Sequence, residues 1–204
     1  MNLSLGEFEA LARKALRGAG YDWGTAEEGA RAARTLARFG CDSAALIERL
    51  THWAVDRDLA RHRPALDLTP TTTPLCPLAA GIALVDLAPP MPVELGTVVE
   101  PTLLVPFVQT LLGRSDDPAR GARVISGRVT ATVHREALEI STTLVPDVVR
   151  IEAAELAPVH QALQSRIDPA PATVAALEAM ASRTYAPATE ASRSGAGPAL
   201  SDND

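Results

Sequence analysis

Two helical patterns meet at a glycine-bounded loop within residues 4–40, and they constrain the fold of this chain more than any other feature. Ser4 and Glu7 form a capping box, in which each residue satisfies a backbone N–H group at the start of a helix. Apolar residues follow at helical spacing. Gly18 and Gly20 end this helix, because glycine adopts the left-handed conformation without steric cost.

A second helix is predicted to start at Thr25, where Glu28 completes another capping box, and to end at Gly40. Its inner face carries small side chains, mostly alanine, so that a neighbouring backbone can approach closely. Together the two patterns predict an αα-hairpin with a tight loop at residues 21–23.

The loop itself places two large aromatic residues, Tyr21 and Trp23, on either side of Asp22 and between glycines. One interpretation is that the aromatic side chains fold back and cover the local core. The other is that they line a pocket or contact a partner, because rigid amphipathic aromatics suit recognition. Most of the aromatic residues of the chain lie in its first quarter, which favours the core interpretation for most of them.

The composition excludes several classes of function. The chain has 204 residues and a net charge of −6. That charge argues against nucleic acid and anionic membranes as main partners, because both attract basic surfaces. The two cysteines, Cys41 and Cys76, show neither metal-ligand spacing nor the pattern of a disulfide framework.

No segment has the character of a secretory signal or a membrane span. The N-terminus lacks a basic stretch before an apolar run. The longest apolar runs, 77–85 and 103–108, are far shorter than the roughly 20 residues that a membrane helix requires. We therefore predict a soluble, cytoplasmic protein.

The rest of the chain alternates between helical and extended patterns. Residues 129–133 and 138–141 alternate between apolar and polar, as in an antiparallel pair with one face on a core. The other predicted elements are a third helix from Asp42 or Ser43 to about Arg61, a helix after Cys76-Pro77, a strand over 93–99, a helix over 102–112, a strand over 148–151, a helix over 154–165 and a helix from Thr173.

These elements predict an α+β fold in a single domain that spans residues 1–204. The domain would comprise a helical part over 1–63, with the hairpin and the third helix, and a part over 93–152 with a small antiparallel sheet. C-terminal helices and an extended tail over 182–204 would follow.

Few side chains have the character of catalytic groups. Cys76 precedes a predicted helix, whose dipole would favour a thiolate, but no partner base lies near it in sequence, so a small buried thiol is the better interpretation. His134 falls on the polar side of the strand pattern, which predicts an exposed histidine.

Three segments resemble a family of bacterial proteins known only as a domain of unknown function. They are Tyr21-Asp-Trp-Gly24 with Ala26-Glu-Glu28, the Cys76-Pro77 segment, and Tyr185-Ala-Pro-Ala-Thr-Glu-Ala-Ser-Arg193 with Ser201-Asp-Asn-Asp204. The resemblance extends over nearly the whole chain. It implies no activity, substrate or cofactor.

The leading functional hypothesis is a small-molecule site between the opening loop and the tail. Its candidate ligand-binding residues are Tyr21, Asp22, Trp23, Tyr185, Glu190, Ser192 and Arg193. An arginine there can hold a carboxylate or phosphate, and the aromatics can stack on a ligand. Glu190 and Arg193 can equally form a surface ion pair with each other.

The alternative hypothesis is a non-catalytic interaction module or accessory subunit, whose partner is a protein. The sequence lacks a phosphate-binding loop and metal-ligand clusters, so we assign no catalytic residues, cofactor or metal site. Whether the protein is an enzyme, and whether it forms homo-oligomers, stays open at this point.

Overall fold

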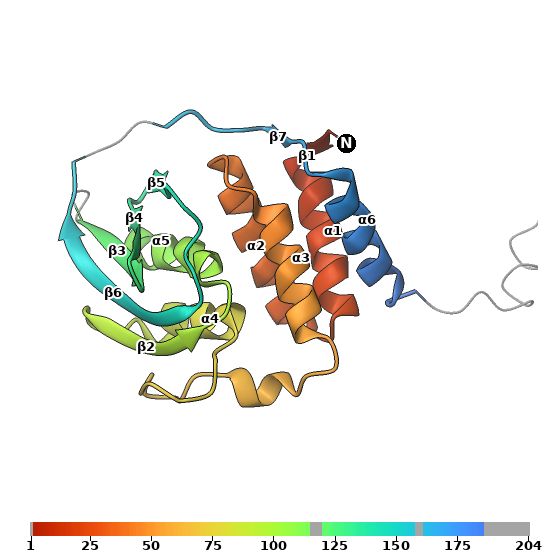
Figure 1. The fold of residues 1–204 in the computed structure, drawn as a ribbon. Coiled ribbons are helices and arrows are strands. Elements are labelled where there is room, and N and C mark those ends of the chain that lie inside the picture. The colour runs from red at the N-terminus through yellow and green to blue at the C-terminus, as the bar shows by residue number, and fades with distance from the viewer. Residues whose placement is uncertain (1, 115–119, 158–160, 186–204) are drawn as a thin grey trace, which may run out of the picture.

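The computed structural model describes residues 2–114, 120–157 and 161–185. The fold is α+β, as predicted: a curved sheet lies at one side of the molecule and a group of helices at the other (Figure 1). The helices are α1 (Leu5–Gly18), α2 (Trp23–Arg38), α3 (Ser43–Ala54), α4 (Pro77–Leu87), α5 (Val105–Gly113) and α6 (Pro171–Ser182), with short 3-10 helices η1 (Leu59–His62) and η2 (Pro101–Leu104).

The opening hairpin forms as predicted, but its second helix begins earlier. The capping box of α1 is present, with the backbone N–H of Glu7 donating to Ser4 Oγ over 3.2 Å. In α2 the cap is Asp22 instead of Thr25, because the Asp22 carboxylate accepts bonds from both the backbone N–H and the hydroxyl of Thr25, at 2.8 and 2.9 Å. Aspartate is the stronger N-cap, so the helix starts at Trp23.

The C-terminal helix returns to the N-terminal helix. α6 packs against α1 and α3, and β1 (Leu3–Ser4) pairs with β7 (Arg166–Ile167) beside it (Figure 1). Gly18 of α1 lies so close to α6 that a Cβ atom there would stand 1.8 Å from the carbonyl oxygen of Met180. Residues near both ends of the described chain are thereby held together.

The main sheet has five antiparallel strands in the order β2-β6-β3-β4-β5. The strands are β2 (Val93–Val98), β3 (Arg120–Ser126), β4 (Val129–Val133), β5 (Leu138–Glu139) and β6 (Asp147–Glu155). Val124, Ala131 and Ile151 face the core, whereas Arg150 and Glu152 form an ion pair on the exposed face. This is the one-sided sheet that the alternating pattern predicts.

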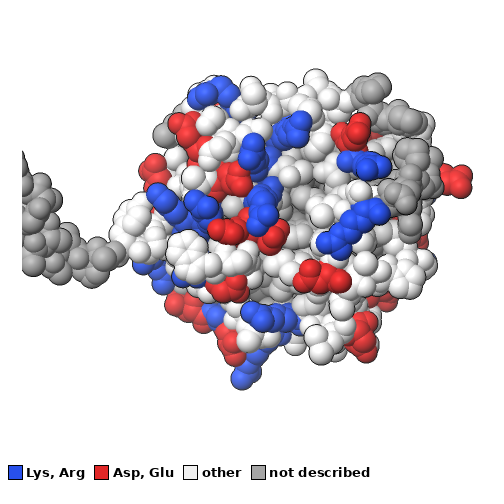
Figure 2. All heavy atoms as spheres, turned by 180° about the vertical axis from the view of Figure 1, so that it is seen from behind, with Lys and Arg blue, Asp and Glu red and all other residues white. Residues whose placement is uncertain are grey.

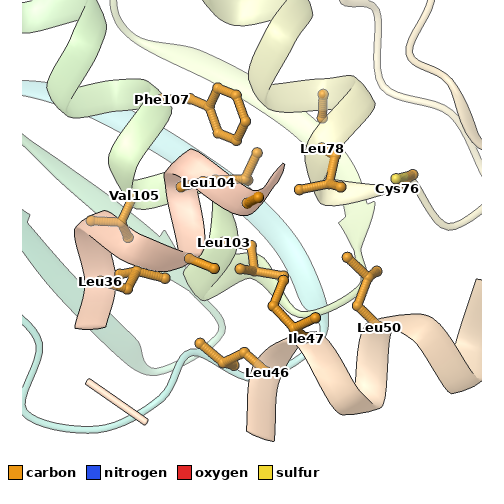
Figure 3. Close-up of a cluster of buried hydrophobic side chains, with 14 of the residues drawn as sticks. Leu36, Leu46, Ile47, Leu50, Cys76, Leu78, Leu103, Leu104, Val105 and Phe107 are labelled. Atoms are coloured by element: carbon orange, nitrogen blue, oxygen red, sulfur yellow. The ribbon is translucent and has the colours of Figure 1, made fainter. Parts of the chain in front are cut away.

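Helices α4 and α5 lie between this sheet and α2. α5 contacts β3 and β4, and α4 contacts both α5 and α2. Figure 3 shows part of the core that joins these layers, where leucine and isoleucine side chains from α2, α3, α4 and η2 lie together, with Phe107 of α5 at one end of the cluster. With few aromatic residues available, the core depends on Leu, Val and Ala.

Three predictions from the sequence are wrong in detail. No helix forms in the described part of 154–165, because β6 continues to Glu155, where it pairs with Arg120 of β3. α3 ends at Ala54, since Asp56 takes a positive φ of 60° and turns the chain. His134 is 91% buried rather than exposed, because it follows the last residue of β4 and its backbone N–H turns back to the carbonyl of Ala137.

The predictions of the helix after Cys76 and of the strand from Val93 are confirmed. α4 begins at Pro77, directly after a buried Cys76, and β2 covers the predicted strand. Within the described ranges, none of the helices is both long and apolar enough to cross a bilayer. Most of the predicted tail, from residue 186 onward, lies outside the described residues.

Candidate functional site

The first aromatic residue of the opening loop belongs to the core. Tyr21 is 3% exposed, and its hydroxyl lies 3.6 Å from the sulfur of Cys76 at the start of α4. Burial raises the pKa of the Tyr21 phenol well above its usual range. Burial also raises the pKa of the Cys76 thiol, which is therefore no activated nucleophile.

Asp22 is a cap and an ion-pair partner. Its carboxylate also lies 3.7 Å from the guanidinium of Arg63. The pKa of Asp22 is lowered, chiefly by the bond from the backbone N–H of Thr25. The hydrogen bonds hold this carboxylate at the helix start, and a lowered pKa makes it a weaker base.

Trp23 and Tyr185 are exposed, and both contact α1. The Arg17 guanidinium lies 4.7 Å from the centre of the Trp23 ring, and the Lys14 ammonium lies 5.9 Å from the centre of the Tyr185 ring. Lys14 and Arg17 are three residues apart and so share one face of the helix. The structure therefore brings the opening loop and Tyr185 to the same face of α1.

The other three candidate residues, Glu190, Ser192 and Arg193, lie outside the described residues. Of the four that are described, only Asp22 lines a large hollow. Trp23 and Tyr185 do not line it, since their rings lie against Arg17 and Lys14 of α1, and Tyr21 is buried in the core.

That hollow is a groove of about 1010 Å³ between α2, α4 and α5. Asp22 and Gly24 lie among its lining residues, at the start of α2. The principal side chains along it are Glu27, Glu28, Arg31, Arg34 and Arg38 of α2, Ile82, Val85 and Asp86 of α4, and Phe107, Gln109, Thr110 and Arg114 of α5. Basic and acidic side chains are interspersed on the face of the molecule that Figure 2 shows.

Two arginines of the groove are already neutralised. Arg31 lies 3.0 Å from Glu28, and Arg34 lies 2.8 Å from Glu9 of α1. Arg38 and Arg114 have no carboxylate partner among the described residues, although the Arg114 guanidinium donates to the backbone carbonyl of Val85.

The apolar part of the groove is firmly held. Phe107 packs against Gly81 of α4, where an added Cβ would stand 2.3 Å from the ring. Gln109 of α5 is also fixed, because its amide nitrogen donates to the backbone carbonyls of His134 and Arg135 at 3.3 and 3.2 Å. Helices α4 and α5 thus form a close-packed wall opposite α2.

The ionisable side chains in the described lining of the groove are carboxylates and guanidiniums. Its described lining contains no histidine, cysteine, lysine or tyrosine, the side chains that most often act as nucleophiles or proton carriers near neutral pH. In the described ranges, no group of three His, Cys, Asp or Glu side chains is placed to hold a metal ion.

Sequence reasoning missed this groove. Its walls come from three segments that are distant in sequence, and their contact is a property of the tertiary fold. One signal was present: Arg31, Arg34 and Arg38 recur at helical spacing and mark a basic stripe on α2. Nothing in the pattern indicates that α4 and α5 face this stripe.

Comparison with known families gives one match. Residues 3–91 match a family model described as a protein of unknown function, DUF3726. This confirms that the N-terminal part of the chain, from β1 to the end of α4, resembles a family defined by a domain of unknown function. The match includes the Tyr21–Glu28 and Cys76-Pro77 motifs and ends before the C-terminal one. No curated protein and no solved structure matches the chain.

Proposed function

We propose that this protein binds a small organic anion in the groove between α2, α4 and α5. The observation that carries the proposal is the pair of guanidiniums, Arg38 and Arg114, that line a groove of about 1010 Å³ without a carboxylate partner among the described residues. Small-molecule sites are typically clefts of about 300–1,000 Å³ in which a few polar groups fix the ligand.

The ligand would combine an anionic group with an apolar body. A guanidinium binds carboxylates and phosphates with two parallel hydrogen bonds, which gives both strength and orientation. Ile82, Val85 and Phe107 supply apolar contact surface in the same groove. A carboxylate or phosphate ester with a hydrocarbon or aromatic part matches this combination.

Binding without covalent chemistry is the form of this function that the lining supports. Asp22, the one described candidate from the sequence that lines the groove, is held as a cap. Neither Trp23 nor Tyr185 lines the groove, so each would contact only a ligand that extends beyond it. The groove thus replaces the loop-and-tail site as the centre of the proposal.

The proposal is tested by thermal unfolding of the purified protein with a panel of carboxylates and phosphate esters. Neutral amides and alcohols of the same shape serve as ligand controls. A ligand that binds only the folded state adds about 2.7 kcal/mol of stability at a hundredfold excess over its dissociation constant. We expect anionic members of the panel to raise the melting temperature and their neutral analogues to leave it unchanged.

Variants then locate the site. Arg38→Gln and Arg114→Gln should abolish the shift, whereas Arg61→Gln should preserve it, since Arg61 is exposed, lies outside the groove and pairs with Asp58. A shift that survives both groove substitutions would contradict the proposed site. A panel without any shift would favour the alternative, a non-catalytic interaction module.

We also propose four properties that we infer from the sequence. They are the cytoplasmic location, the bacterial origin, the single-domain organisation and the absence of nucleic acid as a main partner. The net charge of −6 supports the last of these.

A further inference from the structure

A second surface, separate from the groove lining, combines exposed aromatic rings with cations. We call it the basic–aromatic face; it consists of Lys14, Arg17, Trp23 and Tyr185. Trp23 is 66% exposed and Tyr185 is 61% exposed, so both rings leave much apolar area in water. Each ring lies against a cation of α1, which orders the four side chains into one surface.

The cations of this face retain their charge for a partner. Neither Lys14 nor Arg17 forms an ion pair with a described residue, and Arg17 donates only to the backbone carbonyl of Tyr21. The nearby carboxylates are engaged elsewhere, because Asp22 pairs with Arg63 and Glu27 lies 4.0 Å from both Arg13 and Arg31. In a protein of net charge −6, the face is a local site of positive charge.

The chain supplies an occupant of complementary charge directly beside the face. Residues 186–204 follow Tyr185 and carry Glu190, Asp202 and Asp204 against a single Arg193, a net charge of −2 from three acidic groups and one basic group. Nineteen residues reach up to about 60 Å when extended, whereas the 14-residue helix α1 is about 21 Å long. The segment is therefore long enough to cover the whole face.

We propose that residues 186–204 dock on the basic–aromatic face of their own chain, with acidic side chains against Lys14 and Arg17 and the backbone across Trp23. Tethering raises the effective concentration of the segment to the millimolar range, so that individually weak contacts suffice. The proposal is independent of the groove ligand, since it requires no small molecule.

Trp23 reports on the docking directly, because the chain has one other tryptophan, Trp53. In a Trp53→Phe background, we compare the full chain with a chain that ends at Tyr185. In the full chain at low salt we expect emission at shorter wavelength and weaker quenching by acrylamide. Truncation should remove both effects, and 1 M salt should reduce them, because the Debye length falls to about 3 Å.

A second pair of variants keeps the test decisive if the truncated chain fails to fold. Glu190→Gln, Asp202→Asn and Asp204→Asn together neutralise the segment at full length and should expose Trp23 as truncation does. The matched control, Glu94→Gln with Glu136→Gln and Glu155→Gln, changes the net charge equally but at exposed positions on the sheet side, and should leave Trp23 unchanged.

Two results would overturn the proposal. One is identical emission and quenching of Trp23 in the full, truncated and neutralised chains at low salt. The other is protection of Trp23 that appears only at high protein concentration, which would mean that the segment comes from a second copy. Since neither measurement includes a ligand, both results would leave the groove proposal unaffected.

Discussion

The hydroxyl of Tyr21 and the sulfur of Cys76, 55 positions apart in sequence, lie 3.6 Å from each other in the core. Tyr21 ends the turn after α1, and Cys76 precedes the first residue of α4. The contact joins the opening hairpin to the helix that forms one wall of the groove. It therefore links the most distinctive loop of the sequence to the candidate site through the core.

We predict that this buried phenol makes the protein sensitive to alkali. The pKa of Tyr21 is raised in the folded state, so folding keeps a proton that the unfolded chain loses above its ordinary pKa of about 10. The resulting stability is complete below that pH and is lost as the pH rises above it. Because the unfolded chain releases one proton that the folded chain keeps, the free energy of unfolding falls by about 1.4 kcal/mol for each pH unit above that value.

The measurement is urea unfolding between pH 8 and 11, compared with Tyr21→Phe. The groups other than Tyr21 and Cys76 titrate alike in both proteins, so the difference between the two curves reports the phenol together with its contact to the Cys76 thiol. We expect the loss of stability above about pH 10 to be less steep in Tyr21→Phe. Parallel curves would show that Tyr21 ionises without unfolding.

The contact between α1 and α6 predicts opposite effects of two identical substitutions. Gly18→Ala places a methyl group 1.8 Å from the Met180 carbonyl oxygen, so the helices must separate. We expect a loss of about 1–3 kcal/mol in the free energy of unfolding, as for overpacked cores. Gly6→Ala, on the same helix with nothing within 4 Å, should be neutral or stabilise by up to about 1 kcal/mol.

Chemical denaturation of both variants checks this prediction. Equal effects of the two substitutions would mean that α6 does not press against Gly18 in solution.

The cap of α2 predicts a pH-dependent stability. Asp22→Ala should cost about 1 kcal/mol near neutral pH, since it removes the acceptor of the Thr25 N–H bond. The pKa of Asp22 is lowered in the folded state. The charged cap therefore stabilises the folded protein fully at pH values above the unfolded pKa of about 3.9, and this stabilisation is lost as the pH falls through the folded pKa.

The difference between wild type and Asp22→Ala should therefore shrink between pH 5 and pH 2. Asp22→Asn, which keeps an acceptor, should cost less than Asp22→Ala at neutral pH. Helix content and thermal unfolding report both effects, and a difference that stays constant with pH would contradict the role of the charge.

The ion pair between α3 and the start of η2 predicts a measurable coupling. Arg49 Nε and Nη2 donate to the two carboxylate oxygens of Glu100 at 2.7 and 2.9 Å. The side chain of Glu100 is mostly buried. A double-mutant cycle of Arg49→Gln and Glu100→Gln should give a coupling near about 1 kcal/mol, the upper end for exposed pairs. A coupling near zero would place this contact among the surface pairs that add no stability.

Local patterns in the sequence predicted most of the helices and strands. Capping residues, glycine stops, the proline at the start of α4 and two-residue alternation depend on neighbours within a few positions, so they can be read without the fold. The errors occurred where longer-range contacts override local preference. β6 extends into the predicted helix because Ala154 and Glu155 pair with β3, and His134 is buried by the return of the chain at Ala137.

The candidate site was far less accessible to prediction. Tyr21 and Trp23 are two positions apart and have similar chemistry, yet Tyr21 is 3% exposed and Trp23 is 66% exposed. Tyr21 precedes the helix cap and its hydroxyl contacts Cys76 in the core, whereas Trp23 is the first residue of α2 and lies on the outer side of that helix. The sequence could name both residues but could not separate their roles.

The sequence alone determined the α+β class, the hairpin with its glycine ends and the helix after Cys76, because these follow from backbone preference and the period of apolar residues. The tertiary structure alone decided that α4 and α5 face the arginine stripe of α2, and that Tyr185 and Trp23 both lie against cations of α1. Both depend on packing between segments distant in sequence, where burial of apolar surface and close backbone approach at Gly18 and Gly81 select one arrangement.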